Sequence, residues 1–143
     1  MKKVCLLLGP NLNMVGIREK DIYGEETAES INIQISKKAK DGGLLCDIFQ
    51  SNWEGALIDK IQEAKDKYDG IIINAGALSH YSISIRDAIA CIKIPCIEVH
   101  MSNIYAREEY RKKSVISEVC AGQIVGFGKN VYFLAIDAIR DLM

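Results

Sequence analysis

The chain alternates short apolar runs with longer amphipathic segments, and this alternation constrains its fold more than any other feature. These runs are mainly apolar on both faces, as in strands of a parallel sheet that is covered on both sides. They lie at about 3–9, 43–49, 70–74, 94–99 and 119–126. The amphipathic segments predict helices, and these span 27–41, 53–67, 81–91, 104–112 and 129–141. We therefore expect an α/β, flavodoxin-like, doubly wound five-stranded parallel sheet with helices on both faces.

The composition fits one domain, 1–143, and excludes several classes of function. Hydrophobic residues make up 49% of the chain and charged residues 26%, which is typical of globular proteins. A formal net charge of −1 gives no general attraction to nucleic acid or to an anionic membrane. No apolar run reaches the roughly 18 residues of a membrane-spanning helix. The five cysteines lack zinc-type spacing, which argues against a metal site and favours a reducing cytoplasm.

The chain has only two histidines, and each follows a predicted strand. His80 comes shortly after the run 70–74, and His100 closes the run 94–99. The carboxyl ends of the strands are where open α/β sheets bind ligands. An imidazole changes its charge near neutral pH. We interpret the two histidines as parts of an acid–base site at this edge of the sheet.

The residues around each histidine leave a functional and a structural interpretation open. Glu98, His100 and Ser102 alternate, which puts the three side chains on one side of an extended chain. A carboxylate beside an imidazole fixes its tautomer and favours its protonated form, as a general acid requires. His100 could instead be satisfied by local hydrogen bonds. His80 lies at the predicted start of a helix, where it could bind a ligand or cap the helix.

The segment 10–26 is predicted to be an active-site lid loop. It follows the first strand and is much longer than an ordinary βα loop of about 2–6 residues. It begins near Asn11 and carries Arg18 and Tyr23. The alternative is an ordered surface loop in which arginine and tyrosine occur together by chance.

A dense charge run, 107–113, contains Arg107 and Arg111 at a spacing of one helical turn. The usual meaning of such a run is a solvated helix. Two like charges at this spacing are unfavourable unless a carboxylate or a phenolate lies between them. The run therefore indicates either a solvated helix or a cationic part of the site.

Taken together, the segments resemble the type II dehydroquinase family over nearly the whole chain, in order and at family spacing. The matching segments are Gly9-Pro10-Asn11-Leu12-Asn13, Gly16-x-Arg18, Tyr23-Gly24, Phe49-Gln50-Ser51-Asn52-x-Glu54-Gly55, Ile72-Ile73-Asn74-x-Gly76-Ala77-x-x-His80, Arg86-Asp87-Ala88, Glu98-Val99-His100-x-Ser102-Asn103, Arg107-x-x-x-Arg111 and Ala121-Gly122-x-Ile124-x-Gly126-x-Gly128. The chain departs from the family at Ala75, where proline is usual. It departs again after Arg111, where the family often has two histidines and a tyrosine and this chain has Lys112-Lys113-Ser114-Val115.

The resemblance implies dehydration of 3-dehydroquinate to 3-dehydroshikimate in aromatic biosynthesis, by anti elimination through an enolate and without metal or organic cofactor. It implies that Tyr23 is the base and that Arg18 favours its phenolate. His100, oriented by Glu98, would protonate the leaving hydroxyl, and Asn11 would hold a water against the enolate oxygen.

The resemblance also implies a set of substrate-binding residues and an assembly. The binding residues are Asn74, His80, Asp87, Met101, Ser102 and Arg111. Arg107 would support Tyr23, and Asp87 would reach the site from a neighbouring subunit. A homododecamer built of trimers is expected.

Two hypotheses that assign the chain to another class of function remain open. One is a non-catalytic binding module for a flavin or small anion, and the other is a scaffold domain.

Overall fold

A five-stranded sheet forms the centre of the computed structural model, which describes residues 1–17 and 26–143. In that part of the chain the strands are β1 (Lys3–Leu8), β2 (Leu45–Gln50), β3 (Gly70–Asn74), β4 (Cys96–His100) and β5 (Gly122–Val125). They lie in the order β2-β1-β3-β4-β5, and every neighbouring pair is parallel. This is the strand order of flavodoxin-like sheets, so the predicted fold class is confirmed.

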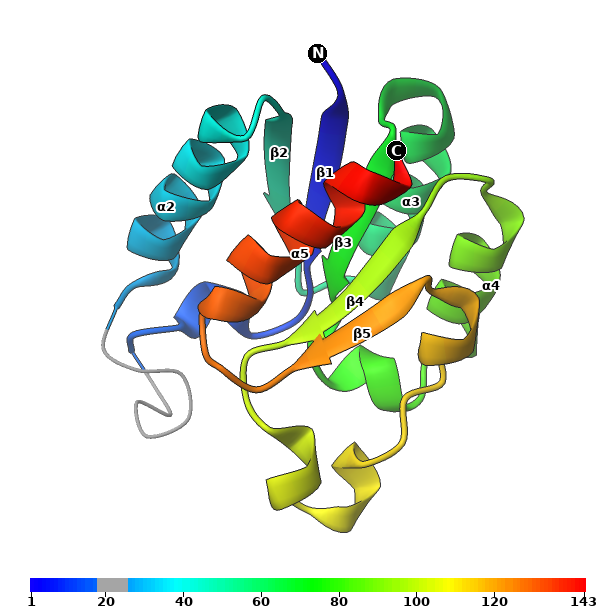
Figure 1. The fold of residues 1–143 in the computed structure, drawn as a ribbon. Coiled ribbons are helices and arrows are strands. Elements are labelled where there is room, and N and C mark those ends of the chain that lie inside the picture. The colour runs from blue at the N-terminus through cyan, green and yellow to red at the C-terminus, as the bar shows by residue number, and fades with distance from the viewer. Residues whose placement is uncertain (18–25) are drawn as a thin grey trace.

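Helices cover both faces of the sheet (Figure 1). In chain order they are α2 (Ala28–Asp41), α3 (Glu54–Lys67), α4 (Ile83–Cys91) and α5 (Asn130–Leu142). α2 and α5 pack on one face, whereas α3 and α4 pack on the other, which divides the apolar core into two layers. Both layers bury alternate residues of the same strands, as runs that are apolar on both faces predict. No helix in the described ranges is long and apolar enough to cross a membrane.

The strand register brings three chain segments together at the carboxyl edge of the sheet. Leu8 at the end of β1 lies opposite Asn74 at the end of β3, and the Gly9 amide donates to the Asn74 carbonyl at 2.8 Å. β4 lies on the other side of β3 and ends at His100. The loops after these central strands therefore emerge side by side, where the sequence predicts a site.

One predicted helix, 104–112, is wrong. The structure has two short 3-10 turns there, Ile104–Ala106 and Glu109–Arg111, joined through an extended Arg107. Within these turns Ile104 alone is buried. A helix in a protein is stabilised mainly by an apolar face packed on a core, and this segment has no such face.

The sequence Ser51-Asn52-Trp53-Glu54 has the pattern of a capping box, which predicts a helix start there, but the structure forms no such box. α3 begins after Trp53 without a side-chain cap, and the Ser51 hydroxyl accepts from the Trp53 amide at 3.0 Å. The Glu54 carboxylate accepts a hydrogen bond from Ser82, the N-cap of α4. A tertiary contact between two helices has replaced the local reciprocal one.

We expect Gly9→Ala to lower stability and to disturb the turn after β3. A Cβ at Gly9 would lie 2.5 Å from the carbonyl oxygen of Ala75 and 2.7 Å from its carbonyl carbon. Because both atoms belong to the backbone, the strand ends must separate, at a cost of about 1–3 kcal/mol. Urea denaturation measures the change. Gly55→Ala is the matched control, because a Cβ there meets nothing within 4 Å in the first turn of α3. Equal stabilities for the two variants would contradict the close approach.

Candidate active site

A pocket at the carboxyl edge of the sheet collects most of the predicted site residues. Its predicted members are Asn74, His80, His100, Met101, Ser102, Arg107 and Arg111. Its remaining lining comes from Pro10, Leu12, Gly76, Ala77 and Ile104. The pocket is thus built by the segments that follow β1, β3 and β4, in agreement with the expected position of a ligand site.

The centre of the site is a buried pair of an imidazole and a carboxylate. His100 Nε2 lies 2.6 Å from Glu98 Oε2, the Glu98 side chain is 0% exposed and that of His100 is 6% exposed. Because a carboxylate only accepts, Nε2 must carry the proton of this hydrogen bond. The other ring nitrogen, Nδ1, is then the one that can exchange a proton with a ligand in the pocket.

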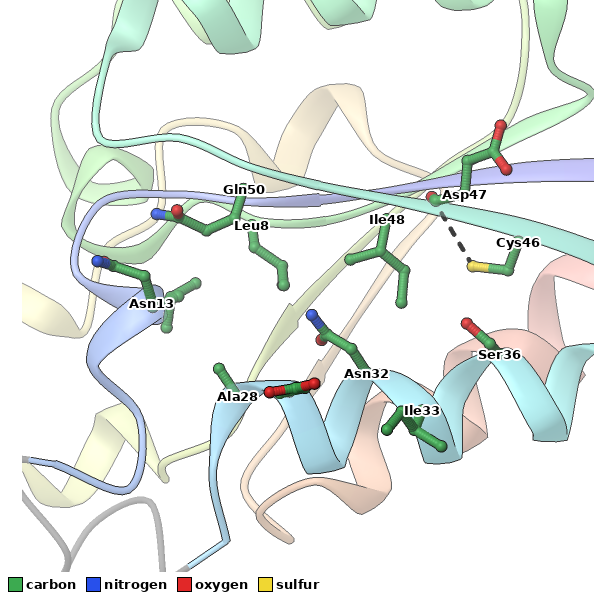
Figure 2. A pocket seen from close by; sticks show the side chains of 12 residues that line it. Leu8, Asn13, Ala28, Asn32, Ile33, Ser36, Cys46, Asp47, Ile48 and Gln50 are labelled. Carbon is green, nitrogen blue, oxygen red and sulfur yellow. Dashed lines mark hydrogen bonds between the residues drawn. The ribbon is translucent and has the colours of Figure 1, made fainter.

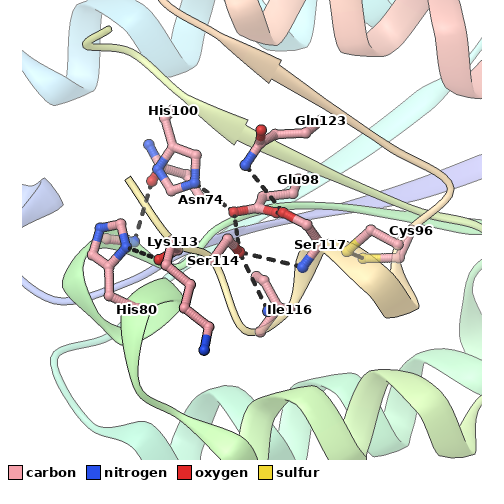
Figure 3. Close-up of polar contacts among 12 residues, drawn as sticks. Asn74, His80, Cys96, Glu98, His100, Lys113, Ser114, Ile116, Ser117 and Gln123 are labelled. Carbon is pink, nitrogen blue, oxygen red and sulfur yellow. Dashed lines mark hydrogen bonds and ion pairs between the residues drawn. The ribbon is translucent and has the colours of Figure 1, made fainter. Parts of the chain in front are cut away.

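Glu98 remains ionised because hydrogen bonds outweigh the cost of its burial. Burial alone would raise the pKa of Glu98, but hydrogen bonds from His100, Ser117 and Ser114 hold that pKa below its ordinary value. The Ser114 hydroxyl donates to Oε2 at 2.8 Å, and the Ser117 hydroxyl donates to Oε1 (Figure 3). The negative charge of Glu98 therefore lies beside the ring of His100, whose Nε2 proton it accepts.

His80 is oriented by the backbone. Its Nδ1 lies 2.7 Å from the carbonyl oxygen of Lys113, so Nδ1 is the protonated nitrogen and Nε2 is left for a ligand. Its ring stacks on that of His100, with 6.0 Å between centroids and 19° between planes. His80 ends the 3-10 turn Gly76–His80, and Ser82 caps α4, so the helix-capping interpretation of His80 is wrong.

The two arginines form a cationic wall of the pocket. The Glu108 carboxylate lies between them, 2.6 Å from Arg111 Nε and 3.9 Å from Arg107 Nε. Arg107 Nη1 also donates to the Ser102 hydroxyl at 3.3 Å. The carboxylate between the two arginines offsets the repulsion between their positive charges. The guanidinium groups also suit a ligand that carries a carboxylate.

Asn74 is fixed by two neighbours. Its Nδ2 donates to the Tyr132 hydroxyl of α5 at 3.0 Å, and its Oδ1 accepts from the Gly76 amide at 3.2 Å. These bonds set which end of the amide faces which neighbour. Tyr132 lies on α5 and is 3% exposed.

The other predicted residues lie elsewhere. Asn11 starts the 3-10 turn after β1 and has an exposed side chain that does not line the described pocket. Asp87 is exposed on α4 and is also away from that lining. Arg18 and Tyr23, with the rest of the segment 18–25 of the predicted lid, lie outside the described residues.

A larger hollow has no activated thiol among its described lining residues. The groove between α2 and β2 has a volume of about 860 Å³, against about 40 Å³ for the histidine pocket (Figure 2). Burial raises the pKa of its Cys46 thiol to about 12, so the thiol stays protonated and unreactive. Its Asp47 accepts from the Tyr68 hydroxyl at 2.7 Å. We therefore place the site at the histidines.

Glu98→Gln should lower the free energy of unfolding at neutral pH by about 1.5–3 kcal/mol, the contribution of hydrogen bonds to a charged group. The folded-state pKa of Glu98 is below its unfolded value of about 4.3, so the ionised carboxylate stabilises the fold above that pH. This stabilisation is lost as pH falls through the folded pKa. The difference between parent and variant should shrink below about pH 4. Urea denaturation across that range measures it, and a pH-independent difference would contradict the assignment.

The fold and the pocket define a flavodoxin-like α/β protein whose site pairs an imidazole with a buried carboxylate, as acid–base enzymes do. The sequence profile described as "Dehydroquinase class II" matches residues 2–140. The chain belongs to the class II dehydroquinase family, and it is an enzyme of the lyase class.

Relatives match along their whole length. A 3-dehydroquinate dehydratase of Bacillus cereus (strain AH187) is 54% identical over 141 residues, which cover 99% of this chain and 97% of the relative. A protein of the same name from Caldicellulosiruptor saccharolyticus is 54% identical over 144 residues, with 100% and 99% covered. The crystal structure of a type II dehydroquinase from Butyrivibrio crossotus has a TM-score of 0.95 at 50% identity and covers 97% of both chains. The fold prediction and the family resemblance are therefore confirmed.

Proposed function

We propose that this enzyme dehydrates 3-dehydroquinate to 3-dehydroshikimate by anti elimination through an enolate. The observation that carries the proposal is the buried Glu98–His100 pair, with Oε2 and Nε2 2.6 Å apart, in a pocket that also holds two arginines. The pair supplies an acid, and the arginines suit the substrate's carboxylate. The product of this step would enter the shikimate pathway of aromatic amino-acid biosynthesis.

The first half of the reaction removes a proton from the carbon alpha to the ketone. Tyr23, as phenolate, takes this proton, and Arg18 stabilises the phenolate charge. The electron pair of the broken C–H bond moves onto the ketone oxygen as an enolate. Asn11, which starts the 3-10 turn after β1, holds a water against that oxygen. Arg107 supports Tyr23 from the pocket wall.

The second half expels the hydroxyl group. The enolate collapses, a carbon–carbon double bond forms, and the C–O bond on the opposite face breaks. His100 gives its Nδ1 proton to the departing hydroxyl, which leaves as water. Glu98 keeps its charge throughout and stabilises the imidazolium before transfer. Every electron shift is heterolytic and every proton has a protein donor or acceptor, so the steps call for no metal or organic cofactor.

The remaining pocket residues hold the substrate. His80 Nε2, Asn74 and Ser102 face the pocket with polar atoms suited to hydroxyl groups. The backbone near Met101 and the Arg111 guanidinium bind the carboxylate. Asp87 completes the site of a neighbouring subunit in a homododecamer of trimers, consistent with its exposure on α4. All five cysteines are free, which suits work in the cytoplasm.

A stereospecifically labelled substrate tests the mechanism. Deuterium is placed on the carbon alpha to the ketone, at the position anti to the leaving hydroxyl, and mass spectrometry follows the product. We expect the label to be lost to solvent, and the opposite epimer of the labelled substrate to retain it in the product. Retention of the anti label during turnover would contradict the proposal. Quinate, which has no ketone and cannot form the enolate, is the matched control and should not react.

A further inference from the structure

The segment 112–121 contacts the groups that hold the two histidines in place. Its Lys113 carbonyl accepts from His80, and its Val115 amide donates to the Ser79 carbonyl at 2.8 Å. Two of its hydroxyls, those of Ser114 and Ser117, reach the carboxylate of Glu98 (Figure 3). The segment 112–121 thus contacts the turn that carries His80 and also contacts Glu98, the hydrogen-bond partner of His100.

The two serines satisfy a buried charge without neutralising it. The Glu98 side chain is fully buried, and among the described residues its one ion-pair partner is His100. A buried carboxylate is tolerated only when its oxygens are hydrogen-bonded. Neutral hydroxyl donors meet that need and leave the negative charge available to His100, which a lysine or arginine would have cancelled.

The hydroxyl protons are directed at Glu98 by the bonds that their oxygens accept. Ser114 Oγ accepts from the amides of Ile116, at 3.3 Å, and Ser117, at 3.2 Å. Ser117 Oγ accepts from Gln123 Nε2 of β5 at 3.1 Å. A hydroxyl carries a single proton, so each serine, once its oxygen is engaged as an acceptor, points that proton at the carboxylate.

We propose that Ser114 and Ser117 are positioning residues: they hold the Glu98 carboxylate in one orientation and thereby fix the tautomer and ring orientation of His100. The consequence for turnover rests on the proposed function, because it assumes that His100 is the acid. The serines do not touch the substrate pocket, so their loss should affect proton transfer rather than substrate binding.

Two measurements on the full chain test this proposal. Steady-state kinetics of the Ser114→Ala/Ser117→Ala double variant should show kcat at least about tenfold lower, part of the 10²–10⁴-fold that a positioned acid supplies, with KM changed by less than about twofold. Nitrogen-15 NMR of the imidazoles reports their tautomers. The chain has only two histidines, so both signals are resolved, and His80→Asn assigns them. We expect the His100 signal to show a tautomer mixture and the His80 signal to keep its parental form.

Controls separate positioning from folding. Ser79→Ala removes a buried hydroxyl beside His80 that has no hydrogen-bond partner within the described residues, so it should leave both readouts unchanged. Ser114→Thr/Ser117→Thr keeps the hydroxyls and should restore kcat. If the double alanine variant does not fold, each single alanine variant gives the same test with a smaller effect. A folded variant with parental kcat and a parental His100 spectrum would overturn the proposal. If the parent protein has no dehydratase activity, the proposed function fails while the NMR arm still decides the positioning role.

Discussion

Replacing His100 with asparagine is expected to lower kcat by about 10²–10⁴-fold, the usual contribution of a general acid. Asparagine keeps a polar group next to Glu98 but cannot exchange a proton at neutral pH. Because substrate binding is assigned to other side chains, KM should change far less than kcat. Steady-state kinetics with 3-dehydroquinate measures both. His80→Asn is the matched control, and it should raise KM more than it lowers kcat.

A substrate analogue can show that the missing function is proton donation. If a fluorine atom replaces the hydroxyl group that leaves, it departs as the fluoride anion and needs no acid. The His100→Asn variant should then recover most of the parental rate on the analogue. A variant that remains equally impaired on both compounds would show that His100 does something other than protonate the leaving group.

Replacing Tyr23 with phenylalanine should abolish measurable turnover and leave the fold and the affinity for substrate largely intact. The change removes one oxygen, and with it the base that takes the proton alpha to the ketone. We expect a loss of at least about 10²–10⁴-fold in kcat. Kinetics gives the rate, and isothermal titration calorimetry with the substrate gives the affinity, since the variant does not consume it.

Tyr81→Phe is the control for this substitution. Tyr81 follows His80 directly and is 65% exposed, so the same chemical change there should leave kcat unchanged. Parental turnover by a folded Tyr23→Phe variant would show that the base is another group. Loss of turnover together with loss of substrate affinity would instead assign Tyr23 to binding.

The sheet was predictable because its central strands are buried on both faces. Every residue of β3 and of β4 is buried, and both sequences are mainly apolar on the two faces of the sheet. This pattern indicates a parallel sheet covered by helices, and it also places the strand ends. The sequence alone therefore assigns the histidines to the carboxyl edge.

Contacts between charged side chains could be predicted only where the two residues are near in sequence. The Glu98–His100 contact spans two residues along a strand, and the alternating pattern anticipates it. The charge run near Arg111 was ambiguous because the same residues suit a solvated helix. The absence of a buried apolar face on 104–112 decided against that helix, and this became visible only with the tertiary structure.

The hydrogen bonds that hold the site residues in place could not be predicted from the spacing of residues along the sequence. Ser114 and Ser117 lie 16 and 19 residues from Glu98, and Tyr132 lies 58 residues from Asn74. Serine in a loop and tyrosine on an amphipathic helix are common and carry no local signal of such contacts. The Glu54–Ser82 contact, which replaced the expected capping box, is likewise long-range. Hydrogen bonds of this kind follow from the packed fold rather than from periodicity.

The most direct test of the account is the ultraviolet absorbance of the parent protein mixed with 3-dehydroquinate in the presence of a metal chelator. The product is a conjugated enone and absorbs where the substrate does not. We predict rising absorbance at a rate that the chelator does not change, and no rise with Tyr23→Phe. A flat trace from the folded parent protein would contradict the account and would favour a binding module on the same fold.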